Sequence, residues 1–154
     1  MLWAGKDGGP ALVVVDPAGP AVTADLDSLP TSWHALAERY QIAWCRVRGA
    51  RRPEETVEDA LETLAEQSTR VDLIAGGPAC ELALSVAAHF PQVVRGLLLV
   101  DPAGAIDSAE ITARGVRVAV LAGGPRSRRD RAETPVSLGH PFVVDAVTAA
   151  LPST

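Results

Sequence analysis

Four side chains of this sequence have the chemistry to act at a shared site: His140, Asp16, Asp101 and Cys80. His140 precedes Pro141 at the start of a predicted helix, where the positive end of the helix dipole disfavours protonation and keeps the imidazole neutral. A neutral imidazole can act as a general base, and it can equally cap the helix. Both roles stay open from the residues alone.

Asp16 and Asp101 each end a short apolar run. We expect the two runs to be neighbouring strands, which would bring the carboxylates within a few ångströms of each other and raise the pKa of one of them. With His140, such a pair would suit proton transfer in a lyase, isomerase or cyclase. The same three groups could also bind a divalent cation, but no recognised ligand spacing supports it, and we predict no metal site.

Cys80 is the alternative nucleophile, because a helix N-terminus can lower the pKa of a thiol. An esterase or thioesterase would then work through Cys80, or through His140 and water. The helix around Cys80 is otherwise apolar, which favours a small buried core residue. Cys45 lies in a segment of different character, so the two cysteines of the chain predict neither a disulfide nor a zinc site.

Five apolar runs predict strands that are buried on both faces. They cover residues 12–16, 41–47, 71–75, 96–101 and 116–122, and a short sixth strand is predicted at 135–138. Helical spacing of apolar residues predicts helices at 33–40, 57–65, 78–90 and 141–151, and Pro53 with Glu54-Glu55 suits the start of the second of them. The alternation predicts an α/β fold with a doubly wound, mainly parallel sheet of five to six strands and helices on both faces, as a single domain over residues 1–154.

The loops after four of the predicted strands echo one another. Asp16-Pro17-Ala18-Gly19 resembles Asp101-Pro102-Ala103-Gly104, and Ala75-Gly76-Gly77-Pro78 resembles Ala122-Gly123-Gly124-Pro125. All four belong to the carboxyl edge of the sheet, where open α/β sheets bind ligands. We expect a small molecule or a partner protein there, although such residues also serve plain tight turns. The expected binding residues are Pro17, Gly76, Gly77, Pro78, Gly104 and Gly124.

Residues 71–84 read VDLIAGGPACELAL, and residues 88–102 read AHFPQVVRGLLLVDP. This pattern resembles the α/β-hydrolase superfamily, in which a strand leads into a nucleophile elbow and a buried helix, and the next strand often ends in Val-Asp-Pro. Leu138-Gly139-His140 resembles the segment that carries the catalytic histidine of that family. The resemblance implies a minimal, three-layer hydrolase-like sandwich.

The resemblance also implies that the usual chemistry is missing. Gly77 falls where the elbow pattern Gly-x-Ser-x-Gly has its nucleophile, and glycine has no side chain that attacks a substrate. Asp16-Pro17 replaces the His-Gly pair of the oxyanion loop, and proline has no N–H to donate. The acid expected near Pro125 is absent, with Asp130 as the nearest substitute, and residues 101–116 are too few for a lid. We therefore expect a lidless pseudoenzyme.

The composition limits the remaining function classes. The chain has 154 residues and a net charge of −5 at pH 7, which argues against nucleic acid, because binding to its phosphates needs clustered cations. No apolar stretch is long enough to cross a bilayer and no signal peptide is evident, so we expect a cytoplasmic protein that does not bind membranes. Nucleotide motifs are absent, and we expect no cofactor. A homodimer remains an open alternative.

Overall fold

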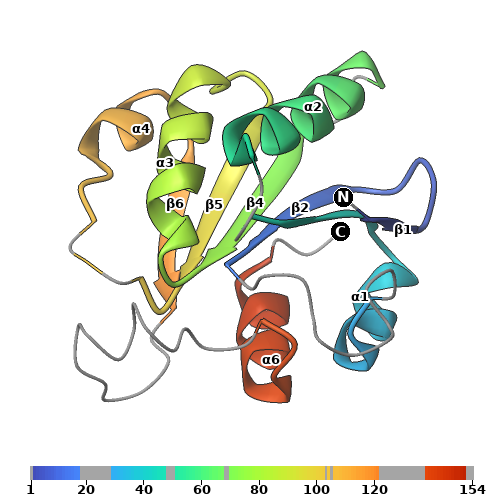
Figure 1. Cartoon of the computed structure of the whole chain (residues 1–154). Helices are drawn as coiled ribbons and strands as arrows, with labels where there is room; N and C mark the ends of the chain where they lie inside the picture. Colours follow the sequence, from blue (N-terminus) through green and yellow to red (C-terminus); the bar gives the residue numbers. More distant parts are fainter. Residues whose placement is uncertain are drawn as a thin grey trace.

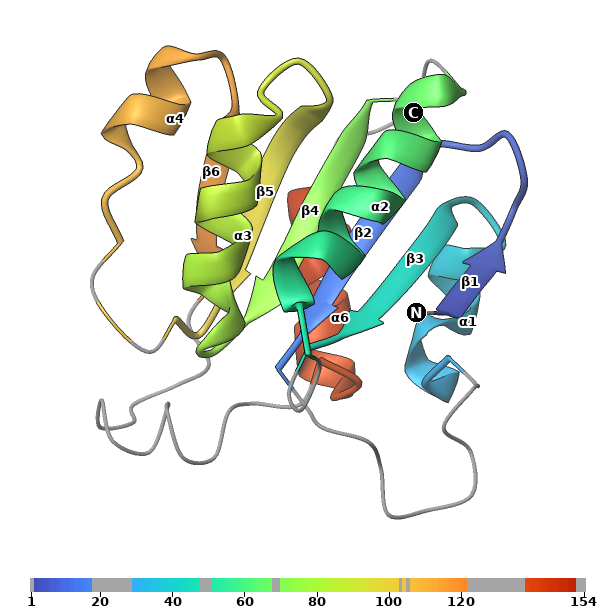
Figure 2. The ribbon, with the colours of Figure 1, turned by 45° about the horizontal axis from the view of Figure 1, so that its top comes forward.

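The computed structural model describes residues 2–17, 29–47, 51–67, 70–102, 104, 106–121 and 138–151. Within these ranges six strands form one sheet in the order β1-β3-β2-β4-β5-β6. In chain order they are β1 (Leu2–Gly5), β2 (Ala11–Asp16), β3 (Gln41–Arg46), β4 (Val71–Gly76), β5 (Val94–Val100) and β6 (Arg117–Leu121). Only β1 pairs antiparallel, so the carboxyl ends of the other five strands meet at one edge (Figure 2).

The five strands expected from apolar runs are confirmed to within two residues at each end. β1 was not among the expected strands, because its four residues are too few to show a periodicity. Its extended conformation is fixed by antiparallel pairing with β3. Of the strand expected at 135–138, residues 135–137 lie outside the described residues, and Leu138 stands in a turn.

Helices cover both faces of the sheet (Figure 1). One layer contains α2 (Pro53–Glu66), α3 (Ala79–His89) and α4 (Ala109–Ala113), and the other contains the 3-10 turn η1 (Thr31–Trp33), α1 (His34–Ala37) and α6 (Pro141–Ala150). The helix expected at 33–40 is shorter than predicted, because the chain turns after Ala37 to enter β3. α4 was not anticipated from the sequence.

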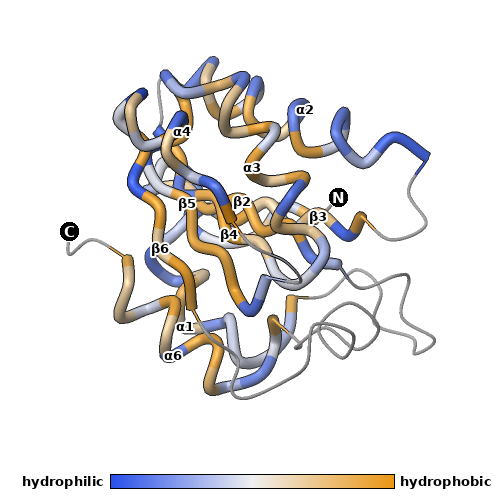
Figure 3. Tube along the Cα trace, turned by 90° about the vertical axis from the view of Figure 1, so that its left-hand side faces the viewer, coloured by the Kyte–Doolittle hydropathy of each residue, from blue (hydrophilic) through white to orange (hydrophobic). Residues whose placement is uncertain are grey.

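Each layer of helices covers its own apolar core. Leu73 and Leu99 pack with α2 and α3, whereas Ile74 and Leu98 pack with α1 and α6. Consecutive strand residues point to opposite faces, which explains why the strands are apolar along their length (Figure 3). The fold class is confirmed as α/β with one mainly parallel sheet. Every helix in the described ranges falls short of the length and apolarity that crossing a bilayer requires.

Candidate ligand-binding site

A sharp turn at Gly77 connects β4 to α3. Gly77 has φ +49°, in the left-handed region that glycine adopts without steric cost. Its N–H donates a 2.9 Å hydrogen bond to the carbonyl oxygen of Val100 at the end of β5. The backbone thus makes a tight strand-to-helix turn with no side chain at its tip.

A pocket of about 300 Å³ opens beside this turn, between the start of α3 and the loop after β5. Three of the expected binding residues line it, namely Gly77, Pro78 and Gly104. Pro17 and Gly76 are buried and do not line it, and Gly124 lies outside the described residues. The sequence missed Pro102, Glu81 and Ile106, which complete the lining with Cys80. Pro102 stands in one of the echoed loops, but no local signal marked Ile106.

Cys80 is a core residue. It is 1% exposed, and its Sγ lies 3.7 Å from the carbonyl oxygen of Ala75 and 4.0 Å from that of Val100. Burial raises the pKa of this thiol to about 12. The thiolate is the reactive form of cysteine, so this thiol stays protonated and unreactive at neutral pH. These observations favour the core interpretation over the esterase alternative.

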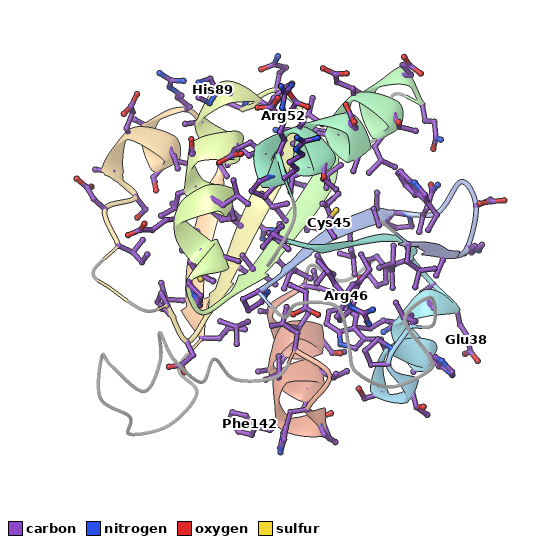
Figure 4. All side chains as sticks on the ribbon, in the orientation of Figure 1. Glu38, Cys45, Arg46, Arg52, His89 and Phe142 are labelled. Atoms are coloured by element: carbon purple, nitrogen blue, oxygen red, sulfur yellow. The ribbon has the colours of Figure 1, made fainter. Side chains whose placement is uncertain are left out.

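The carboxylate of Asp16 interacts with two side chains of β3. Trp44 Nε1 donates to Asp16 Oδ2 over 3.0 Å, and Arg46 Nε lies 4.0 Å from the same oxygen. Figure 4 shows Arg46 on the side of the sheet that faces α6. Asp16 is 8% exposed. Its position therefore fits a structural carboxylate that fixes two neighbouring side chains.

Asp101 lies apart from Asp16. The expectation that their strands are neighbours is wrong, because β4 lies between β2 and β5. Two strand spacings of about 4.8 Å each separate the strand ends. Asp101 has φ +47°, and its N–H donates to the carbonyl oxygen of Leu121 over 2.7 Å. Its charge adds to the effect of burial in raising the pKa of the Cys80 thiol.

His140 caps α6. Its Nδ1 accepts a 3.1 Å hydrogen bond from the backbone N–H of Phe142, and its side chain is exposed. The capping alternative is thereby confirmed. An Nδ1 that accepts leaves the proton of the neutral ring on Nε2. A base working through Nε2 needs the opposite tautomer, so this arrangement does not favour general base catalysis.

The segment before His140 is held by η1 and by β4. Trp33 Nε1 donates to the carbonyl oxygen of Leu138 over 2.7 Å, and Ser32 Oγ donates to that of Gly139. The side chain of Leu138 packs on Gly76. These contacts place His140 at the carboxyl edge of the sheet even though its ring points outward.

A metal centre finds no support in the described ranges, where no group of three or more His, Cys, Asp or Glu side chains is arranged to hold an ion. Asp130 and the loop around Pro125 lie outside these ranges. The part of the site that the structure describes therefore consists of the Gly77 turn and the pocket beside it, and His140 is not among the residues that line this pocket.

No model of a known protein family matches the sequence. Comparison with curated proteins likewise finds no match. Among solved structures, protein Atu2452 of unknown function from Agrobacterium tumefaciens str. C58 is similar over 95% of this chain and 91% of its own, with 13% identity and a TM-score of 0.58.

Two further solved structures are similar at lower TM-scores. A protein named a CIB-like hydrolase from Thermoplasma acidophilum matches 94% of this chain and 89% of its own, with 16% identity and a TM-score of 0.44. A protein named a lipase from Acinetobacter baumannii AYE matches 70% of this chain at 19% identity and a TM-score of 0.49. This chain spans only 40% of that lipase.

The similarity to the Agrobacterium protein extends over nearly the whole chain, and the strand order and the Gly77 turn add the architecture of the fold. Together they show that this chain has an α/β fold that it shares with the Agrobacterium protein.

Proposed function

We propose that this chain is a pseudoenzyme without serine-type hydrolase activity, which binds a small molecule in the pocket beside Gly77. One observation carries the proposal: the turn that would deliver a nucleophile is retained with glycine at φ +49°, and a pocket of about 300 Å³ opens beside it. A volume of this size is at the lower limit for small-molecule sites. A concave pocket suits a small ligand better than the flat contact of a partner protein.

The lining indicates the kind of ligand. Pro78, Pro102 and Ile106 offer apolar surface, and Glu81 is the ionisable group with an exposed side chain among the lining residues. A carboxylate in the first turn of α3 opposes an anion at that helix end. A small, largely apolar and uncharged molecule with a single hydroxyl or carbonyl group therefore fits best.

The enzyme alternatives receive less support. A protonated Cys80 is a poor nucleophile, and His140 uses Nδ1 to cap α6. Asp16 ends β2 and Asp101 follows β5, and β4 lies between these two strands, which argues against an acid and base pair of a lyase or isomerase. The cytoplasmic location and the homodimer stay predictions.

Two experiments test the proposal. Wild-type protein should not react with a fluorophosphonate, and its turnover of p-nitrophenyl acetate should not exceed that of His140→Ala. If the fluorophosphonate labels any residue, or if His140→Ala abolishes a measurable turnover, the proposal that this chain lacks hydrolase activity is wrong. A Gly77→Ser variant, assayed beside Gly77→Ala, then reports whether the turn and His140 are still aligned for attack.

Binding is tested with cyclohexanol as the probe and amide NMR shifts as the measurement. A Cβ at Gly104 meets nothing within 4 Å, so Gly104→Leu should fill the pocket without straining the fold. We expect shifts at Gly77 and Ile106 in wild type and their loss in Gly104→Leu, with Gly104→Ala as the matched control. Equal shifts in wild type and Gly104→Leu, or none in wild type, contradict binding in this pocket.

A further inference from the structure

A second cavity, of about 310 Å³, lies near the amino ends of β4, β5 and β6. Its apolar surface comes from Leu98 and Ala119 on the strands and from Ala150 and Leu151 at the end of α6. Figure 3 views the molecule from the β6 side, where the end of α6 lies beside the sheet. Gly77 follows the opposite end of β4, so this cavity is separate from the pocket described above.

Asp72, Gly96 and Arg117 form one row across the three strands, in direct register. The missing side chain of Gly96 leaves room between its neighbours. A Cβ added there would lie 2.6 Å from Asp72 Oδ1 and 3.8 Å from Arg117 Nη2. The carboxylate and the guanidinium thus approach each other over Gly96, yet no ion pair within 4.0 Å joins them.

The charge of Asp72 is already balanced. A register shift in the pairing of β4 with β5 lies between Val71 and Asp72, and Arg95 Nη2 donates to Asp72 Oδ2 over 2.6 Å. Asp72 is 2% exposed. A purely structural role for Asp72 would need only this ion pair with Arg95. The second oxygen, Oδ1, receives no hydrogen bond from the described residues and lies beside the cavity.

Arg117 provides an excess positive charge at the rim. Its side chain is exposed and forms no hydrogen bond or ion pair with the described residues. The cavity therefore combines one guanidinium that no described residue neutralises, one carboxylate oxygen that can accept a hydrogen bond, and an apolar wall. This set of groups calls for a ligand with a single negative charge, a neutral donor beside it and a short apolar body.

We propose that this cavity binds a small, branched 2-hydroxy carboxylate. The carboxylate of the ligand accepts hydrogen bonds from Arg117, and its hydroxyl donates to Asp72 Oδ1. The branched alkyl group lies against Leu98, Ala119 and Leu151. A ligand charge of −1 balances Arg117, and a hydroxyl donor adds no further charge next to the neutralised pair of Asp72 and Arg95.

Isothermal titration calorimetry with 2-hydroxy-4-methylpentanoate tests this assignment. We expect binding by wild type and at least about tenfold weaker binding by Arg117→Gln, because a hydrogen bond to a charged group is lost. Arg51→Gln is the matched control: it removes the same charge from an exposed arginine that forms no ion pair with the described residues. Its affinity should equal that of wild type.

Ligand analogues and a second variant complete the test. 4-Methylpentanoate lacks the hydroxyl and 3-methylbutanol lacks the carboxylate, and each should bind at least about tenfold more weakly. Ala119→Leu narrows the cavity without changing charge and should also abolish binding, with the fold verified by circular dichroism. The proposal is overturned if wild type does not bind the hydroxy acid at millimolar concentration, if Arg117→Gln and wild type bind equally, or if L-leucine binds more tightly.

Discussion

The side chain of Leu138 packs directly against Gly76, so that a Cβ added to Gly76 would lie 2.9 Å from Leu138 Cδ2 and 3.2 Å from Leu138 Cγ. This contact joins the last residue of β4 to the segment that leads into α6. Leu138 is 1% exposed. The close approach is therefore part of a packed core and leaves little space for an extra methyl group.

Gly76→Ala should lower the free energy of unfolding by about 1–3 kcal/mol, because the added methyl overpacks the core against Leu138. Urea denaturation measures the loss, with Gly104→Ala as a control whose Cβ meets nothing within 4 Å. In a Leu138→Ala background the same substitution should cost less, since the clashing atoms are gone. If Gly76→Ala lowers the free energy of unfolding equally in both backgrounds, contact with Leu138 is not the reason that glycine is favoured at position 76.

Gly77→Ala should destabilise the protein by about 1–2 kcal/mol, because its φ of +49° is costly for a residue with a Cβ. Gly77→Asn should lose less stability, since asparagine tolerates the left-handed region better than alanine. Thermal unfolding of the two variants beside Gly104→Ala measures the difference. If Gly77→Ala unfolds like Gly104→Ala, the turn is free to relax into another conformation.

His140→Ala should cost about 0.5–2 kcal/mol of stability through the lost helix cap. His140→Asn should retain most of that stability, because the asparagine side chain can accept the N–H of Phe142 that Nδ1 accepts now. Asparagine cannot act as a base, so the pair separates capping from catalysis. An ester hydrolysis rate that falls equally in both variants, with stability kept only in His140→Asn, would reveal a catalytic role.

Stability should fall as the pH rises from about 9 towards 12. Burial raises the pKa of Cys45 and of Cys80 from 9.0 to about 12. Below pH 9 the thiols are protonated in both states, and above it only the unfolded chain releases its protons, which favours unfolding. Figure 4 shows Cys45 on the α2 side of the sheet. Urea denaturation over this range should give a flatter profile for the variant Cys45→Ala/Cys80→Ala. A profile unchanged by the double substitution would assign the loss to other groups.

Much of the fold could be predicted from the sequence because strands buried on both faces are continuous apolar runs. Residues 71–75 and 96–101 illustrate this, and both form central strands. β1 could not be found in this way, since Trp3 is exposed and the strand owes its order to pairing with β3. The cavity lined by Asp72 could not be predicted either, because it depends on the strand register that sets Gly96 between Asp72 and Arg117.

The sequence by itself determined that the turn after β4 has no nucleophile, because residue identity at position 77 settles which atoms exist there. It also determined the α/β class through local periodicity. Only the tertiary structure decided that β4 separates Asp16 from Asp101, that Cys80 is buried and that His140 uses Nδ1 to cap its helix. Strand order, burial and hydrogen-bond partners arise from contacts between segments far apart in the chain, and local spacing does not encode them.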